Sequence, residues 1–259
     1  MEQIEQALRK AREQRQNDPA ARAANSLPNF SAPVSVRYTE TQVIPFQRSQ
    51  LERNRVIATQ LGHPVTDTYR SLRAQVLQAL GHLGKATLGI TSANQGEGKT
   101  LTAVNLAIAI AMDVNQTVLL VDADLRHPSV SKYLGISPQL GLGDYLAGRA
   151  QVSECLYNPG IERLSILPSR DSAGNSAELL ASPQMAQLAK ELKARYPDRL
   201  IIYDLPPLLD TGDTLGFLPS VDATLLVVRE GAVRRSELQR AVDLLAGFNL
   251  LGTVLNAAE

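Results

Sequence analysis

Hydrophobic residues are distributed unevenly along this chain of 259 residues. From about residue 66, short and nearly continuous runs of Val, Ile and Leu alternate with segments of helical periodicity. Such runs are typical of strands buried on both faces of a parallel sheet. We expect strands at Thr87–Ser92, Thr117–Ala123, Leu164–Pro168, Leu200–Leu205, Ala223–Val228 and Gly252–Asn256.

Helical segments lie between these runs, at Asp67–Leu80, Thr100–Met112, Pro183–Arg195 and Ser236–Phe248. Repeated strand–helix alternation predicts a doubly wound, mostly parallel α/β sheet flanked by helices. Residues 1–60 are polar and interrupted by proline. We expect a short helix over Met1–Gln16 and a largely disordered linker over Asn17–Gln47. The chain therefore divides into an N-terminal arm, residues 1–60, and a folded domain, residues 61–259.

Composition excludes several classes of function. Lys and Arg together number 26, as do Asp and Glu, so net charge does not indicate binding to nucleic acid. Cys155 is the single cysteine, and the three histidines show no ligand spacing, so we expect neither a disulfide nor a thiolate metal site. No apolar run approaches the roughly 20 residues that span a bilayer. We expect a cytoplasmic protein without a membrane span of its own.

The first chemical motif is Ala93-x-x-x-x-Gly98-Lys99-Thr100, a P-loop pattern with Ala in place of the first Gly. It follows a predicted strand and opens a predicted helix, where backbone amides and the helix dipole favour phosphate. Lys99 would reach the β- and γ-phosphates, and the Thr100 hydroxyl would bind Mg²⁺. The expected nucleotide-binding set is Asn94, Gln95, Gly96, Glu97, Gly98, Lys99, Thr100 and Leu101.

Acidic residues end two further strands. Val118–Val121 leads into Asp122 and Asp124, and Leu200–Tyr203 leads into Asp204. Because ligands bind at the carboxyl edge of open α/β sheets, we expect all three carboxylates beside the phosphate site. One carboxylate of the first pair could contact Mg²⁺ or its water, and the other could accept a proton from an attacking hydroxyl.

Together, Ala93–Thr100, Val118–Arg126 and Ile201–Pro207 resemble the Walker A, Walker A′ and Walker B motifs of the bacterial tyrosine kinases of exopolysaccharide synthesis. These CpsD/CapB-like P-loop proteins are relatives of the MinD/ParA ATPases. Asn94 occupies the position of the signature lysine of MinD/ParA proteins, which favours the kinase branch. The N-terminal residues Ile4–Leu8 resemble the exosortase-associated subgroup.

The resemblance implies a kinase with ATPase activity that uses ATP and Mg²⁺. It implies that Asp122 is the base for a tyrosine hydroxyl and that Arg126 is a charge partner. It also suggests Asn256 as a contact to the nucleotide base. The implied catalytic residues are Lys99, Asp122, Asp124 and Arg126, and the implied metal ligands are Thr100, Asp124 and Asp204.

The resemblance also implies partners. Asp67-x-x-Arg70-x-x-Arg73 is similar to the ring-forming motif of the family and suggests a homo-oligomer. The cytosolic tail of a membrane chain-length determinant (a polysaccharide co-polymerase) would activate the chain and recruit it to the inner face of the membrane. Family members normally end in a tyrosine cluster, whereas this sequence ends Asn256-Ala257-Ala258-Glu259. Tyr38 is the tyrosine that remains as a candidate acceptor.

Two other functions are compatible with these residues. The chain could be an assembly module of the same polysaccharide system, switched by nucleotide without protein phosphorylation. It could also be a P-loop kinase for a small molecule, with residues 141–175 lining a substrate pocket. The missing tyrosine cluster favours the assembly module, whereas Asn94 and the motif Asp122-x-Asp124-x-Arg126 argue against a MinD/ParA-type protein. The small-molecule kinase has less support, because residues 141–175 offer no convergent set of polar side chains.

Overall fold

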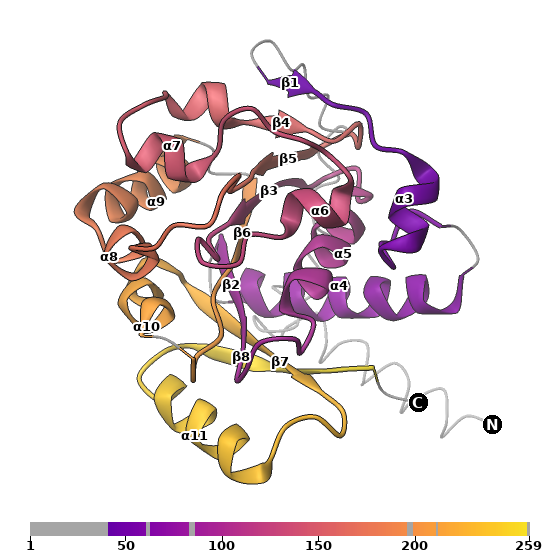
Figure 1. Cartoon of the computed structure of the whole chain (residues 1–259). Helices are drawn as coiled ribbons and strands as arrows, with labels where there is room; N and C mark the ends of the chain where they lie inside the picture. The colour runs from indigo at the N-terminus through magenta and orange to yellow at the C-terminus, as the bar shows by residue number, and fades with distance from the viewer. Residues whose placement is uncertain (1–40, 61–62, 83–85, 196–198, 211, 258–259) are drawn as a thin grey trace, which may run out of the picture. The chain divides into compact units, whose positions relative to one another are not determined.

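The computed structural model describes residues 41–60, 63–82, 86–195, 199–210 and 212–257, all within a unit that begins at residue 35. The described residues form an eight-stranded sheet of order β1-β4-β5-β3-β6-β2-β7-β8 (Figure 1). Neighbouring strands are parallel except for β4 and β5. The strands are β1 (Gln42–Val43), β2 (Thr87–Ser92), β3 (Thr117–Asp122), β4 (Tyr157–Asn158), β5 (Leu164–Leu167), β6 (Arg199–Asp204), β7 (Ala223–Arg229) and β8 (Leu250–Asn256).

Helices cover both faces of this sheet (Figure 1). Alternating residues explain the two layers, since successive side chains of a strand point to opposite faces. In β3, Val118 and Leu120 pack with the helices α3–α6, whereas Leu119 and Val121 pack with α7–α11. The helices are α3 (Arg48–Arg53), α4 (Pro64–His82), α5 (Lys99–Ala111), α6 (Val130–Leu134), α7 (Leu142–Leu146), α8 (Ser176–Leu180), α9 (Pro183–Arg195), α10 (Asp213–Phe217) and α11 (Arg235–Leu245).

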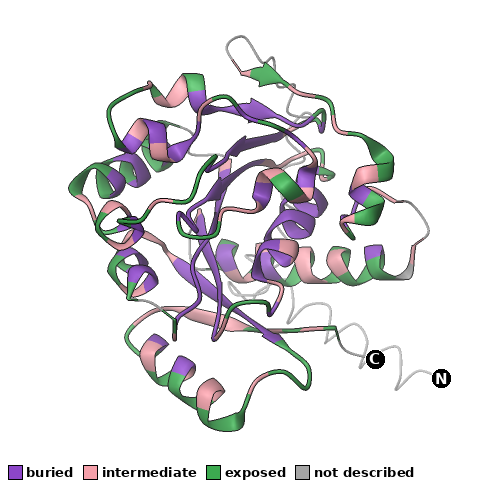
Figure 2. Cartoon of the chain, in the orientation of Figure 1, coloured by how far each residue is buried: buried purple, intermediate pink, exposed green. Residues whose placement is uncertain are grey.

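The predicted fold class is confirmed. All six expected strands are present within two residues of their expected bounds, and β2, β3 and β6 are almost wholly buried (Figure 2). The four expected helices are also present, with α4 beginning three residues earlier and α11 ending three residues earlier than expected. The strands β1 and β4 and five helices of five or six residues were not predicted, because they are too short to show a periodicity.

The prediction of a largely disordered linker over Asn17–Gln47 is wrong for residues 41–47, the part that the structure describes. Gln42–Val43 pairs with β4, and the chain then continues along the domain. Leu51, Val56 and Ala58 are buried in the core beneath α4 and α5, and their irregular spacing explains why no pattern predicted this packing. The helix expected over Met1–Gln16 lies outside the described residues.

The residues of the expected ring-forming motif make contacts within this chain. Arg70 forms a 2.8 Å ion pair with Asp67 on the exposed surface of α4. Arg73 donates a 3.0 Å hydrogen bond from Nη1 to the carbonyl of Ala109, at the C-terminal end of α5. A cation at a helix C-terminus is favourable, so Arg73 has a structural role in the single chain.

Candidate functional site

The carboxyl ends of three adjacent strands build the site. The order β3-β6-β2 places the P-loop, which follows β2, next to the ends of β6 and β3. Asp122 and Asp204 are register partners across β3 and β6, and Ile90 of β2 is the partner of Asp204. The structure therefore brings together the three motifs that lie far apart in the sequence.

The P-loop is held in shape by its own groups and by the last strand. Gly96 and Gly98 have φ angles of 85° and 93°, a left-handed conformation that glycine adopts without strain. The amide of Asn94 donates a hydrogen bond to the carboxylate of Glu97, and Asn256 Nδ2 donates one of 2.9 Å to the Glu97 carbonyl. The Glu97 side chain thus braces the loop, a role that sequence reasoning did not predict.

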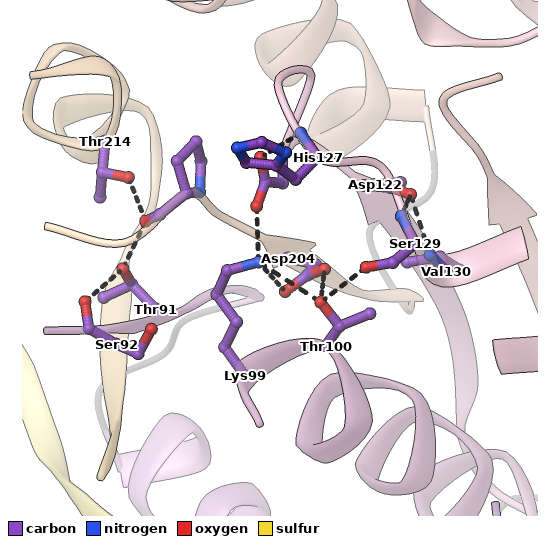
Figure 3. Close-up of polar contacts among 12 residues, drawn as sticks. Thr91, Ser92, Lys99, Thr100, Asp122, His127, Ser129, Val130, Asp204 and Thr214 are labelled. Atoms are coloured by element: carbon purple, nitrogen blue, oxygen red, sulfur yellow. Dashed lines mark hydrogen bonds and ion pairs between the residues drawn. The ribbon is translucent and has the colours of Figure 1, made fainter. Parts of the chain in front are cut away.

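Lys99 and Thr100, the first two residues of α5, contact the carboxylates of the neighbouring strands (Figure 3). The ammonium of Lys99 lies 2.6 Å from Asp124 Oδ2 and 3.7 Å from Asp204 Oδ1. Thr100 donates a 2.6 Å hydrogen bond from its hydroxyl to Asp204 Oδ2. These four side chains are buried and form one connected network.

Asp122 lies beside this network and is fully buried. Its Oδ2 accepts 3.0 Å hydrogen bonds from the amides of Ser129 and Val130, which fixes the start of α6 (Figure 3). Its Oδ1, like Oδ1 of Asp204, is buried without a hydrogen-bond partner among the described residues. Such buried oxygens are costly unless another group binds them.

The site is electrostatically crowded, since three carboxylates surround one ammonium group. Burial raises the pKa of Asp204 to about 6, even though Lys99 opposes this shift. Burial and the neighbouring Asp204 hold the pKa of Asp122 well above its ordinary value. Burial lowers the pKa of Lys99, but Asp204 and Asp124 outweigh burial and raise it. A further cation at this position would relieve the repulsion between the carboxylates.

These groups fit Mg²⁺ bound together with a phosphate. No group of three His, Cys, Asp or Glu side chains in the described part of the chain forms a metal cage by itself. Mg²⁺ does not require one, because it commonly uses one or two carboxylates together with phosphate oxygens and water. The hydroxyl of Thr100 and Oδ1 of Asp204, which accepts no hydrogen bond from a described residue, are oxygen ligands of the required kind.

Described residues line two cavities next to the P-loop. One of about 960 Å³ is lined by Gly96, Gly98, Leu101 and Asn256, among other residues. The other, of about 590 Å³, is lined by residues that include Gln95, Arg126 and Ser129. The guanidinium of Arg126 is exposed, and its Nε donates a 3.4 Å hydrogen bond to Ser176.

Sequence reasoning missed two contributors on the segment between β3 and α6. Ser129 Oγ lies 3.2 Å from the hydroxyl of Thr100, and the amide of His127 donates a 2.9 Å hydrogen bond to Asp124 Oδ1. Both residues follow the predicted Asp-rich motif directly, but an irregular segment has no periodicity that would have identified them.

No described helix is both long and apolar enough to cross a bilayer.

Comparison with known proteins agrees with this geometry. Residues 86–233 match the family described as "AAA domain". The chain is 32% identical over 213 residues to the tyrosine-protein kinase YwqD of Bacillus subtilis, covering 82% of this chain and 89% of YwqD. It is 31% identical over 222 residues to the succinoglycan biosynthesis transport protein ExoP of Rhizobium meliloti, covering 83% of this chain but only 27% of ExoP.

Solved structures show the same relationship. The kinase domain of the Escherichia coli tyrosine kinase ETK matches with a TM-score of 0.72 and 28% identity, covering 84% of this chain and 91% of that domain. The septum site-determining protein MinD of Pyrococcus horikoshii matches with a TM-score of 0.56 and 26% identity, over 66% of this chain and 69% of MinD. The chain therefore belongs to the bacterial tyrosine-protein kinase family, whose P-loop domain is similar in fold to MinD.

Proposed function

We infer that this chain is an ATP- and Mg²⁺-dependent protein-tyrosine kinase with ATPase activity. The observation that carries this inference is the buried network of Lys99, Thr100, Asp124 and Asp204 at the start of the P-loop helix. It unites a phosphate-binding cation, a metal-binding hydroxyl and carboxylates within hydrogen-bond distance. Phosphoryl transfer depends mainly on such positioning and charge stabilisation.

Each residue has a role in this proposal. The loop amides of residues 94–101 and the Lys99 ammonium bind the phosphates, and Lys99 exchanges carboxylate contacts for phosphate contacts. Thr100, Asp204 and Asp124 hold Mg²⁺, which supplies charge neutralisation when bound. Asp122 accepts the proton of the incoming tyrosine hydroxyl, and Arg126 compensates phosphate charge at the mouth of the smaller cavity. Asn256 lines the larger cavity, where its side-chain amide can contact the nucleotide base.

The names of the relatives support a proposal for the cellular role. We place the chain in exopolysaccharide polymerisation or export, as a homo-oligomer at the inner face of the membrane with the cytosolic tail of a chain-length determinant. Residues 1–40 serve as its docking arm, and the kinase domain includes residues 41–60, whose strand β1 and core residue Leu51 pack with it. ExoP, a succinoglycan biosynthesis transport protein, supports this placement. The chain matches 27% of the length of ExoP.

Burial restricts the choice of phosphate acceptor. Tyr157 and Tyr203 are buried within strands, so neither can enter an active site while the domain is folded. Tyr38 lies outside the described residues and stays a candidate acceptor, as do tyrosines of the partner tail.

Transfer of label from γ-labelled ATP tests this function. The purified chain would be incubated with and without the partner tail, followed by phosphoamino-acid analysis of both proteins. We expect phosphotyrosine that depends on Mg²⁺ and is lost in Asp124→Asn. Arg240→Ala, an exposed substitution on α11, is the matched control and should label normally. Hydrolysis without phosphotyrosine would instead favour a nucleotide-switched assembly module, a function that the structural similarity to MinD supports.

A further inference from the structure

The larger cavity beside the P-loop has a wall that none of the nucleotide-binding motifs supplies. Residues Glu52 to Arg55 and Ile57 line this 960 Å³ cavity together with Gly96, Gly98 and Leu101. They belong to the end of α3 and the turn that follows it, residues 51–58, which we call the arm turn. Figure 1 shows α3 and this turn beside α5 and α6.

The arm turn is fixed to the phosphate-binding helix by Asn105. This side chain is fully buried on α5 and makes four hydrogen bonds. Its Oδ1 accepts from the amides of Ile57 and Ala58, at 2.9 and 3.0 Å. Its Nδ2 donates to the carbonyls of Arg55 and Leu101, both at 3.1 Å. A shift of the turn would leave this amide unsatisfied in the core, so the turn and the helix are held as one unit.

Arg55 occupies a strained position in this turn. Its φ is 58°, a left-handed conformation that is uncommon for residues other than glycine. Its guanidinium is exposed at the cavity and has neither a hydrogen bond nor an ion pair to another described residue. Backbone strain of this kind persists where the surrounding structure enforces it, and it is concentrated at functional sites. Here Asn105 is the enforcing group.

The position of the cavity indicates which part of a nucleotide it would receive. Lys99, Thr100, Asp124 and Asp204 do not line it, whereas Ser129, which contacts Thr100, lines the smaller cavity. The β- and γ-phosphates of a nucleotide bound by Lys99 would therefore lie toward the smaller cavity. Its nucleoside and nearest phosphate would then lie toward the larger cavity and the arm turn.

We propose that the arm turn is a wall of the nucleotide pocket and that Arg55 is a binding residue for the phosphate nearest the ribose. This proposal rests on the nucleotide-binding part of the proposed function. A guanidinium is suited to this contact because its fixed N–H donors match phosphate oxygens. Residues 51–58 would then belong to the nucleotide site rather than to a detached arm.

Replacing Arg55 with glycine separates its side chain from its backbone. Arg55→Gly removes the guanidinium and relieves the left-handed strain, so its urea midpoint should equal or exceed that of the wild-type chain. Its Kd for ADP, measured by isothermal titration calorimetry, should rise about 10-fold or more, as loss of a charge-assisted hydrogen bond predicts. Arg55→Lys should recover part of the affinity, and Arg240→Ala should bind ADP normally. Wild-type affinity in Arg55→Gly would overturn the proposal.

Hydrogen exchange provides a second readout that needs no variant. In the full chain, ADP should slow amide exchange in peptides covering residues 51–58 as well as in the P-loop. Protection confined to the P-loop would contradict a wall at residues 51–58. Lys99→Met distinguishes the two levels of inference: if it abolishes ADP binding while Arg55→Gly does not weaken it, the P-loop site stands and the role of Arg55 falls. Absence of ADP binding to the wild-type chain would instead refute the proposed function.

Discussion

The ammonium nitrogen of Lys99 lies 2.6 Å from Oδ2 of Asp124, and both side chains are more than nine-tenths buried. This pair joins the P-loop to the end of β3. The same ammonium lies 3.7 Å from Asp204, so one cation compensates two carboxylates. Replacing Lys99 alone should therefore lower the free energy of unfolding more than replacing Lys99 and Asp124 together.

A double-mutant cycle on Lys99 and Asp124 tests this dependence. Lys99→Met should lower the free energy of unfolding by about 3 to 5 kcal/mol, because it leaves buried carboxylates without a counter-charge. Asp124→Asn should lower the free energy of unfolding by less than Lys99→Met does. The double variant should lose less free energy of unfolding than the sum of the two single losses. Urea unfolding monitored by circular dichroism measures all four proteins. Additive effects would show that the two side chains are not coupled.

Gly98 and Gly96 form a matched pair for testing the P-loop conformation. A Cβ at Gly98 would overlap with the amide nitrogen of Asn256, whereas a Cβ at Gly96 would meet nothing within 4 Å. Both alanine variants carry backbone strain of about 1 to 3 kcal/mol. Gly98→Ala should be the less stable one, and it should also bind ADP more weakly. Combining Gly98→Ala with Asn256→Ala should recover stability, and equal unfolding midpoints for the two single variants would contradict the overlap.

Asp222 should make stability depend on pH. Burial alone would raise its pKa, but hydrogen bonds from Lys193 and from the amide of Ala86 outweigh burial and lower it. A carboxylate with a lowered pKa stabilises the fold above the unfolded value, near 3.9, and loses this contribution as pH falls through the folded value.

Asp222→Asn should therefore cost about 1 kcal/mol at pH 7, a modest figure because solvent partly screens the Lys193 contact. The difference from the wild-type chain should shrink as pH falls below about 4. Guanidinium unfolding of both proteins at several pH values measures this difference in the free energy of unfolding. A gap that stays constant down to pH 3 would mean that this carboxylate does not titrate as described.

Cys155 should be unreactive in the folded chain. Burial raises the pKa of this thiol to about 11, so little thiolate is present at neutral pH. A chromogenic disulfide reagent at pH 8 should label it at least about 100-fold more slowly in buffer than in denaturant, since access requires unfolding. Rapid labelling of the native chain would show that the region around Cys155 opens readily.

The sequence predicted those parts of the fold that have strong periodicity or a known loop chemistry. The strands Thr87–Ser92 and Arg199–Asp204 contain short, nearly continuous apolar runs, and the P-loop has fixed spacing, so their meeting at one sheet edge followed from parallel topology. Arg73 could not be assigned in the same way. The sequence pattern of a charged residue on a helix does not show whether it contacts a neighbouring subunit or, as observed here, donates a hydrogen bond to the carbonyl of Ala109.

The arm turn shows a second limit of prediction. Val56 and Ala58 are buried in the core, but they lie in an irregular turn and neither belongs to a periodic pattern of hydrophobic residues. Asn105 appeared in the sequence as a polar residue within an apolar helix, and three of its four hydrogen-bond partners lie 47 to 50 residues away. Long-range contacts made by single residues are invisible to local pattern reasoning.

The most direct test of the central claim is mass-spectrometric mapping of phosphotyrosine after the full chain is incubated with MgATP and the partner tail. We predict phosphotyrosine on this chain, on the tail or on both, with none in Lys99→Met. Absence of phosphotyrosine from both proteins, while ATP hydrolysis continues and depends on Lys99, would contradict the assignment as a tyrosine kinase.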